Sequence, residues 1–307
     1  MLLARGQLNS VGARQRTHTR DGQPYLYLLP AFAIYLGFFC WPLVRLVQYS
    51  FQDWDGTSKP RFVGFNNYRE LANDPLFWQA FRHNLVWMFA AIVIPTLAGL
   101  VLATILVRSP MYGRSWFRAI FFMPQVLASV VVAITWQWVY SPSFGALNAI
   151  LRDVGLASVQ QGWLGETKYA LPAVFLVWAW TAYGFSMVIF IAALQGIDEE
   201  YFEAARVDGA RRWAQFRHVL LPFIRRPTSV IVLMNAIAAF QVFDLVFVMT
   251  TGGPANATLV LSIYVYQNAF QELRVGYGSA VAVVLGILIV ASSVVFLRLR
   301  GVLGAKA

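Results

Sequence analysis

Residues 277–297 read YGSAVAVVLGILIVASSVVFL, a run of 21 residues without Asp, Glu, Lys or Arg. A helix of that length rises roughly 30 Å, which matches the hydrocarbon core of a bilayer. The whole chain agrees with this run, because 59% of its 307 residues are hydrophobic and 12% are charged, whereas about 25% are charged in an average soluble domain. The sequence therefore predicts an all-α integral membrane protein and excludes an ordinary soluble enzyme or a disordered chain.

Six stretches are long and apolar enough to cross a membrane. The first follows an Arg-bearing leader, but its apolar run is far longer than that of a signal peptide and no small-residue cleavage site is visible, so we expect a retained helix. The six predicted transmembrane helices are 25–47, 84–107, 119–140, 170–194, 227–250 and 277–297.

The charge distribution orients these spans. An even number of spans places both termini on one side, and Lys and Arg are enriched in cytoplasmic segments. With both termini cytoplasmic, the inside segments carry the entire net charge of +10 and the outside segments are balanced. Arg45 and Asp244 lie within predicted spans and cancel. The basic character is thus explained by membrane topology, and we expect no nucleic-acid partner.

Two segments between the spans have features of their own. In the first outer loop, about 48–83, residues 62–68 predict a turn that leads into a short helix before Pro75. In the loop between the fourth and fifth spans, Asp198 is placed to cap a helix that ends near Arg211 and Arg212. That helix has a partly apolar face, which suits either a helix lying on the membrane surface or one that docks into another protein.

At this loop the chain resembles the type I ABC importer permeases, in particular the carbohydrate-uptake group that includes the maltose-transporter subunits. The cytoplasmic signature of that family is Glu-Ala-Ala, three residues, Gly, nine residues, Ile, one residue and Leu-Pro. The chain holds it with Val in place of Ile, at Glu203, Ala204, Ala205, Gly209, Val219, Leu221 and Pro222. The segments 250–254 (TTGGP), 264–266 and 269–270 also resemble the stretch after the family's fifth core span.

The resemblance implies a domain organisation and a set of partners. It implies a basic cytoplasmic tail over 1–24, a first transmembrane helix with its outer loop over 25–79, and a permease domain over 80–298 with a coupling loop at 195–226. The coupling residues Glu203, Ala204, Ala205, Gly209, Leu221 and Pro222 would contact a cytoplasmic ATPase dimer. A second homologous permease subunit and an extracytoplasmic solute-binding protein complete the expected assembly in a prokaryotic inner membrane.

The chain itself contains no Gly-x-x-x-x-Gly-Lys-Ser/Thr loop. We therefore expect ATP and Mg²⁺ to be bound by the partner ATPase, with no cofactor in this chain and no enzymatic activity of its own. The single cysteine, Cys40, excludes an internal disulfide and a cysteine metal cluster. The three histidines are scattered, so the sequence indicates neither a metal site nor a catalytic site.

Candidate substrate contacts lie in the fourth and fifth spans. Asp244 is an ionisable residue within a span, which points to function by default. On a continuous helix, Gln241 shares its face and Phe240 flanks it. The resemblance adds span-four positions by register, at Trp178, Trp180, Thr181, Ala182 and Phe185. Aromatic faces beside polar groups suit a sugar ring. The alternatives are a structural pair of Asp244 with Arg45 and a packing or interfacial role for the tryptophans.

These observations favour a permease subunit of an ATP-driven sugar importer. The first alternative is a permease for glycerol-phosphate-type solutes, although a phosphate would require basic groups in the spans. The second is an ion-coupled secondary transporter, which predicts repeated halves and several intramembrane acids. A membrane enzyme would need a catalytic constellation that the sequence does not offer.

Overall fold

The computed structural model describes residues 23–108 and 112–299, and the chain divides into two compact units, Met1–Arg45 and Leu46–Ala307. The first unit contains α1 (Gln23–Tyr35), the π-helical turn η1 (Leu36–Cys40) and the start of α2 (Trp41–Ser50). These segments form one helix, and its part Tyr27–Ser50 is long and apolar enough to span a membrane. None of its most apolar window is buried against other described residues, as expected for side chains that contact lipid.

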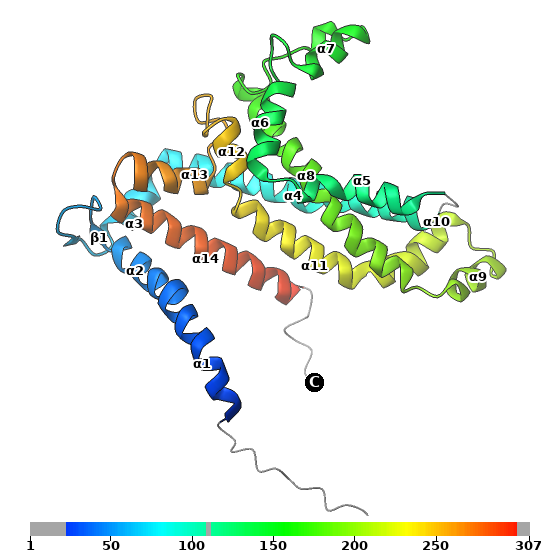
Figure 1. The fold of residues 1–307 in the computed structure, drawn as a ribbon, viewed down its shortest axis with the longest axis horizontal. Helices are drawn as coiled ribbons and strands as arrows, with labels where there is room; N and C mark the ends of the chain where they lie inside the picture. Colours follow the sequence, from blue (N-terminus) through cyan, green and yellow to red (C-terminus); the bar gives the residue numbers. More distant parts are fainter. Residues whose placement is uncertain (1–22, 109–111, 300–307) are drawn as a thin grey trace, which may run out of the picture. The chain divides into compact units, whose positions relative to one another are not determined.

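Four long helices dominate the second unit (Figure 1). They are α4 (Pro75–Arg108), α8 (Thr167–Gln195), α11 (Leu221–Phe240) and α14 (Val275–Leu299). Each of them, α11 together with the short segments before it, is long and apolar enough to cross a membrane. The predicted all-helical membrane fold is thereby confirmed, whereas the orientation of the termini stays a prediction.

The third predicted span is not one straight helix. It consists of α5 (Arg114–Val126) and α6 (Ser129–Val139), which meet at an angle of 97°. Pro124 removes a backbone donor from the last turn of α5, and Leu127 and Ala128 then adopt an extended backbone. The described residues thus provide five candidate spans, or six if this bent pair counts as one.

The fifth predicted span also differs from the expectation. Its helix begins at Arg212 and continues through α10 (Arg212–Gln215) and the π-helical turn η3 (Phe216–Leu220) into α11, which ends at Phe240. Three non-helical residues follow, and a separate short helix, α12 (Asp244–Met249), completes the segment.

Close approach of backbones holds the long helices together. A Cβ atom added to Gly99 of α4 would lie 2.6 Å from the Cβ of the fully buried Ser186 of α8. Similarly, a Cβ on Gly184 of α8 would lie 3.2 Å from the carbonyl oxygen of Phe121 in α5. Small residues at such crossings let membrane helices pack by direct van der Waals contact, which replaces the hydrophobic driving force that lipid does not supply.

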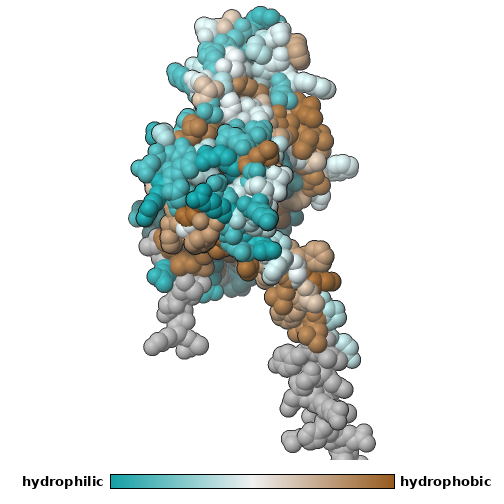
Figure 2. All heavy atoms as spheres, turned by 90° about the vertical axis from the view of Figure 1, so that its left-hand side faces the viewer, coloured by the Kyte–Doolittle hydropathy of each residue, from teal (hydrophilic) through white to brown (hydrophobic). Residues whose placement is uncertain are grey.

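Shorter elements connect these helices at the ends. The first outer loop forms a hairpin of β1 (Gln52–Asp53) and β2 (Arg61–Phe62), followed by α3 (Asn66–Asn73), which confirms the short helix expected before Pro75. Figure 2 shows that hydrophilic side chains gather on the side of the molecule that carries this loop. The remaining short elements are α7 (Ala146–Asp153), η2 (Ala157–Val159), α9 (Glu199–Val207), α13 (Leu261–Tyr266) and η4 (Gln267–Gln271).

Candidate functional site

Side chains from other elements stabilise the interruption between α11 and α12. The fully buried Asn84 of α4 donates a hydrogen bond to the carbonyl of Ala239 (3.2 Å) and accepts one from the N–H of Leu261 (2.7 Å). The hydroxyl of Ser262 in α13 donates to the carbonyl of Val242. The bonds to Ala239 and Val242 satisfy carbonyls that the broken helix leaves free, which is the condition for an irregular backbone at membrane depth.

The interruption corrects the predicted relationship between Gln241 and Asp244. They were expected three residues apart on one helix face, but Gln241 follows the last residue of α11 and Asp244 is the first residue of α12. Both nevertheless line the same cavity of about 210 Å³. Their side chains form no hydrogen bond with another residue in the described part of the chain, so both are available to a ligand.

A second cavity of about 340 Å³ adjoins the first, and the two share Ser129, Trp178, Ala238 and Leu245. One face of α8 lines it, through positions spaced by three or four residues: Trp178, Thr181, Ala182 and Phe185. Ser129 begins α6 directly after the bend between α5 and α6. The paired cavities thus lie where two helix interruptions face α8.

The structure brings together most of the predicted substrate contacts. Trp178, Thr181 and Phe185 line the larger cavity, and Gln241 and Asp244 line the smaller one. Two predicted residues lie elsewhere. Trp180 packs against Trp136 with ring centroids 5.6 Å apart, and Phe240 is 2% exposed and lines neither cavity. Residues two positions apart on a helix point about 200° apart, which explains why Trp178 and Trp180 separate.

Three polar lining residues were not singled out from the sequence: Gln125, Ser129 and Asn235. Asn235 donates a hydrogen bond to the hydroxyl of Thr96 in α4 (3.2 Å) and is 4% exposed. Each is a polar residue within a predicted span, which is the signal that identifies them in retrospect. Among all the described residues that line the two cavities, Asp244 is the only charged one.

The expected coupling loop contains α9, which differs in its ends from the prediction. Asp198 occupies the N-cap position but forms no side-chain capping bond, and the helix ends at Val207, before Arg211 and Arg212. Gly209 has φ +76°, and the N–H of Ala210 bonds to the carbonyl of Ala205. This is a Schellman C-cap, which glycine favours because it adopts a positive φ without strain.

One face of α9 packs against the other helices and the opposite face is exposed. Phe202 is buried and the guanidinium of Arg108, at the end of α4, lies 3.7 Å from its ring centroid. Glu203 is on the exposed face, with 66% of its side chain accessible and Arg206 at 3.7 Å. Leu221 and Pro222 are both exposed in the first turn of α11. The signature residues thus lie on helical segments at one end of the bundle, and their contact with an ATPase stays a prediction.

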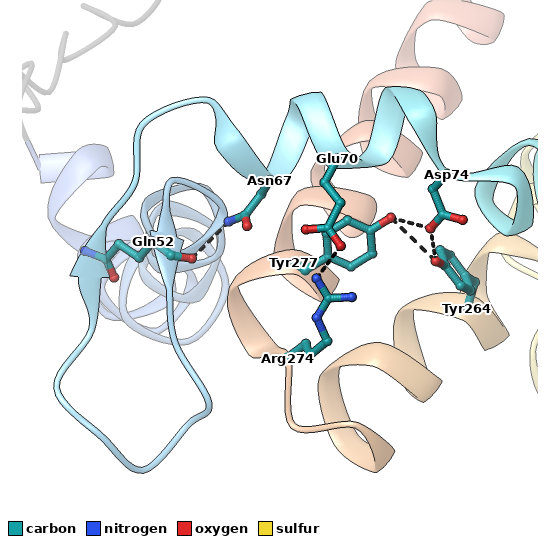
Figure 3. A network of polar contacts seen from close by, with 7 residues as sticks. All are labelled: Gln52, Asn67, Glu70, Asp74, Tyr264, Arg274 and Tyr277. Atoms are coloured by element: carbon teal, nitrogen blue, oxygen red, sulfur yellow. Dashed lines mark hydrogen bonds and ion pairs between the residues drawn. The ribbon is translucent and has the colours of Figure 1, made fainter.

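A polar network fixes the outer loop to α13 and α14 (Figure 3). The hydroxyls of Tyr264 and Tyr277 both donate to Oδ2 of Asp74, and Arg274 forms an ion pair with Glu70. Burial opposes ionisation of Asp74, but its hydrogen bonds from the two tyrosines and from the backbone outweigh burial and lower the pKa of the carboxyl. Burial, and then the bond to Asp74, raise the pKa of Tyr264 to about 12.

Helix α13 links this network to the two cavities. Its Tyr264 contacts Asp74 at the outer loop, whereas its Ser262 donates to the carbonyl of Val242 in the interruption between α11 and α12, and the N–H of its Leu261 bonds to Asn84. The contacts of α13 therefore connect the outer loop to the residues that flank Gln241 and Asp244.

Comparison with known proteins places this architecture in a wider context. Residues 95–307 match the family model described as "Binding-protein-dependent transport system inner membrane component". The chain is 36% identical to the probable ABC transporter permease protein YurN of Bacillus subtilis over 279 residues, covering 90% of this chain and 94% of the relative. It is also 36% identical to the diacetylchitobiose uptake system permease protein NgcF of Streptomyces coelicolor, covering 88% and 80% of the two chains.

A solved structure shares the fold. It is a bacterial alginate ABC transporter in complex with an alginate pentasaccharide-bound periplasmic protein, with a TM-score of 0.80 and 22% sequence identity. The similarity covers 94% of this chain and 97% of the compared chain.

Proposed function

Because the chain belongs to the binding-protein-dependent transport system inner membrane components, we propose that it forms half of the translocation path of an ATP-driven sugar importer. Membership confirms the resemblance carried by the signature between Glu203 and Pro222 and the prediction of an inner-membrane permease component. In this proposal the transported solute passes the paired cavities, and ATP with Mg²⁺ is bound by a separate ATPase dimer. A second permease subunit forms the other half of the path.

The observation that carries the sugar proposal is the lining of the two cavities. Trp178 and Phe185 offer aromatic faces, while Gln241 and Asp244 offer hydrogen-bonding groups that bond to no other described residue. The hydroxyl of Thr181 donates to the carbonyl of Trp178 and can still accept a hydrogen bond from a solute. A sugar ring presents apolar C–H faces and hydroxyl groups, so it needs this combination. Relatives named for sugar uptake, such as NgcF, support the same choice.

The lining also bears on glycerol-phosphate-type solutes, the first alternative. The described residues that line the two cavities include no Lys, Arg or His, and their one charged residue is the acidic Asp244. A phosphate is bound most strongly by cationic groups, which compensate its charge, and it is repelled by a nearby carboxylate, whereas a neutral, hydroxyl-rich solute is not. We therefore favour an uncharged sugar over a phosphorylated solute.

The test begins with purification of the chain from its host in mild detergent and mass spectrometry of the proteins that accompany it. We expect an ATPase with a phosphate-binding loop and a second permease. The solute-binding protein of the same system is then screened by thermal shift against mono- and oligosaccharides and against glycerol phosphates. If only glycerol phosphates stabilise the solute-binding protein, the sugar proposal is wrong. If the chain transports solute without an ATPase, the proposal of an ATP-driven importer is wrong.

A further inference from the structure

A third cavity, of about 790 Å³, is lined by the end of α4 and by the segment from α9 to η3. These segments lie at the other end of the bundle from the outer loop (Figure 1). Its charged lining residues are Arg108, Arg206, Arg212 and Glu199. Three arginines face one carboxylate, so the cavity is cationic. Phe202, Phe216 and Leu220 add an apolar floor.

The three arginines differ in whether a carboxylate compensates their charge. Arg206 is 3.3 Å from Glu199 and 3.7 Å from Glu203, and its charge is compensated by these carboxylates. Neither Arg108 nor Arg212 forms an ion pair with any residue that the structure describes. Arg108 instead lies over the ring of Phe202. Two guanidinium groups therefore remain available to an anion, and guanidinium groups bind phosphate oxygens in pairs of hydrogen bonds.

An apolar stripe leads along α4 to this cavity. Leu97, Val101 and Ile105 follow one another at intervals of four residues, so they share a face of the helix. They are 55%, 56% and 47% exposed. Ile105 itself lines the cavity, and Arg108 ends the helix one turn further on. Along α4, exposed apolar side chains that suit an acyl chain are thus followed by the guanidinium group of Arg108.

The geometry points to an anionic phospholipid as the occupant of this cavity, with its phosphate between Arg108 and Arg212 and an acyl chain along Leu97, Val101 and Ile105. The apolar stripe favours a lipid over a free phosphate ion, because a phosphate ion has no acyl chain that could pack along it. Basic pockets at the membrane surface attract anionic headgroups at roughly 1 kcal/mol per basic residue. The site adjoins α9, because Phe202 and Arg206 belong to both, so a bound lipid would brace the coupling segment.

The inference is tested on the transporter purified with its accompanying subunits. The complex is delipidated and placed in nanodiscs of phosphatidylcholine with or without phosphatidylglycerol, and native mass spectrometry counts the retained lipids. We expect retention of phosphatidylglycerol in preference to phosphatidylcholine. The double variant R108Q/R212Q should bind it about 30-fold more weakly, which corresponds to two basic residues at roughly 1 kcal/mol each.

A matched control is the double variant R225Q/R226Q, which removes the same charge from exposed arginines of α11 outside the cavity. It should retain the lipid, and R108K/R212K should restore binding in part, which separates charge from misfolding. Equal retention by R108Q/R212Q and the wild type would overturn the inference. A preference for phosphatidylcholine would overturn it as well. So would the finding that inorganic pyrophosphate occupies the cavity and phosphatidylglycerol does not. A third contrary result is that a second permease subunit covers Leu97, Val101 and Ile105 and the complex retains no lipid.

Discussion

The hydroxyl of Tyr277 donates a hydrogen bond to Oδ2 of Asp74 over 2.6 Å, although the two residues are separated by 203 positions in the sequence. Tyr264 donates to the same oxygen from α13, so one carboxylate joins the outer loop to two helices (Figure 3). Since Ser262 of α13 also bonds to the interruption beside the paired cavities, this contact connects the loop that carries Asp74 with the proposed solute path.

Replacement of Asp74 by Asn should lower the stability of the protein at neutral pH by about 1–2 kcal/mol, because hydrogen bonds to a charged acceptor are worth more than neutral ones and Asp74 is only partly buried. The pKa of Asp74 is lowered in the folded state. Its contribution is therefore complete above the unfolded carboxyl value of about 4 and is lost as the pH falls through the folded value.

The apparent Tm in detergent, measured from pH 7 down to pH 3, checks this. The difference between wild type and D74N should shrink as the pH falls, while D53N, at an exposed position in the same loop, should follow the wild type throughout. A difference that stays constant with pH would show that the ionised carboxylate is not the stabilising species.

The variants D244N and Q241A should reduce solute uptake at least about tenfold while protein level and basal ATP hydrolysis persist. The reason is that both side chains line the smaller cavity without forming hydrogen bonds to other described residues. Loss of a charge-assisted hydrogen bond to a ligand costs about 1.5–3 kcal/mol. Uptake and ATP hydrolysis in proteoliposomes provide the two measurements.

A contrasting variant is F240A, because Phe240 is 2% exposed and its truncation should cost about 3–5 kcal/mol of stability. It should lower the amount of folded protein, unlike the two cavity variants. If D244N lowers the amount of folded protein as F240A does, Asp244 serves the stability of the protein and not the binding of a solute.

Replacement of Glu203 by Gln should leave the Tm nearly unchanged and should uncouple ATP hydrolysis from transport. The ion pair with Arg206 is exposed and long at 3.7 Å, and such pairs contribute about 0–1 kcal/mol. The matched control is E200Q, on an exposed glutamate of the same helix. Equal transport by E203Q, E200Q and wild type would argue against docking of α9 through Glu203.

Replacement of Gly209 distinguishes a backbone requirement from a contact requirement. A Cβ at this position meets no atom of the chain within 4 Å, but φ is +76°, so G209A should cost about 1 kcal/mol and G209N less, because Asn tolerates a positive φ. If Gly209 serves only as a helix cap, G209N should transport nearly as well as wild type. Loss of transport in both variants, at an unchanged Tm for G209N, would indicate that an ATPase surface approaches this backbone closely.

The sequence by itself was sufficient for features that depend on neighbouring residues. The length of apolar runs predicted the membrane helices, and the spacing from Glu203 to Pro222 identified the family. Residues 62–68 indicated the short helix α3 before Pro75. In each case the deciding property, hydrophobic run length or a local turn signal, lies within about 20 consecutive positions.

Tertiary structure decided where the predicted fifth span breaks and which side chains face the cavities. The interruption after Phe240 depends on Asn84, 155 positions from the carbonyl it satisfies, and the outer loop depends on tyrosines about 200 positions away. A helix continues through an apolar run unless distant groups satisfy the backbone atoms that a break sets free. Those distant partners come together only on folding, so local sequence patterns do not contain the position of the break.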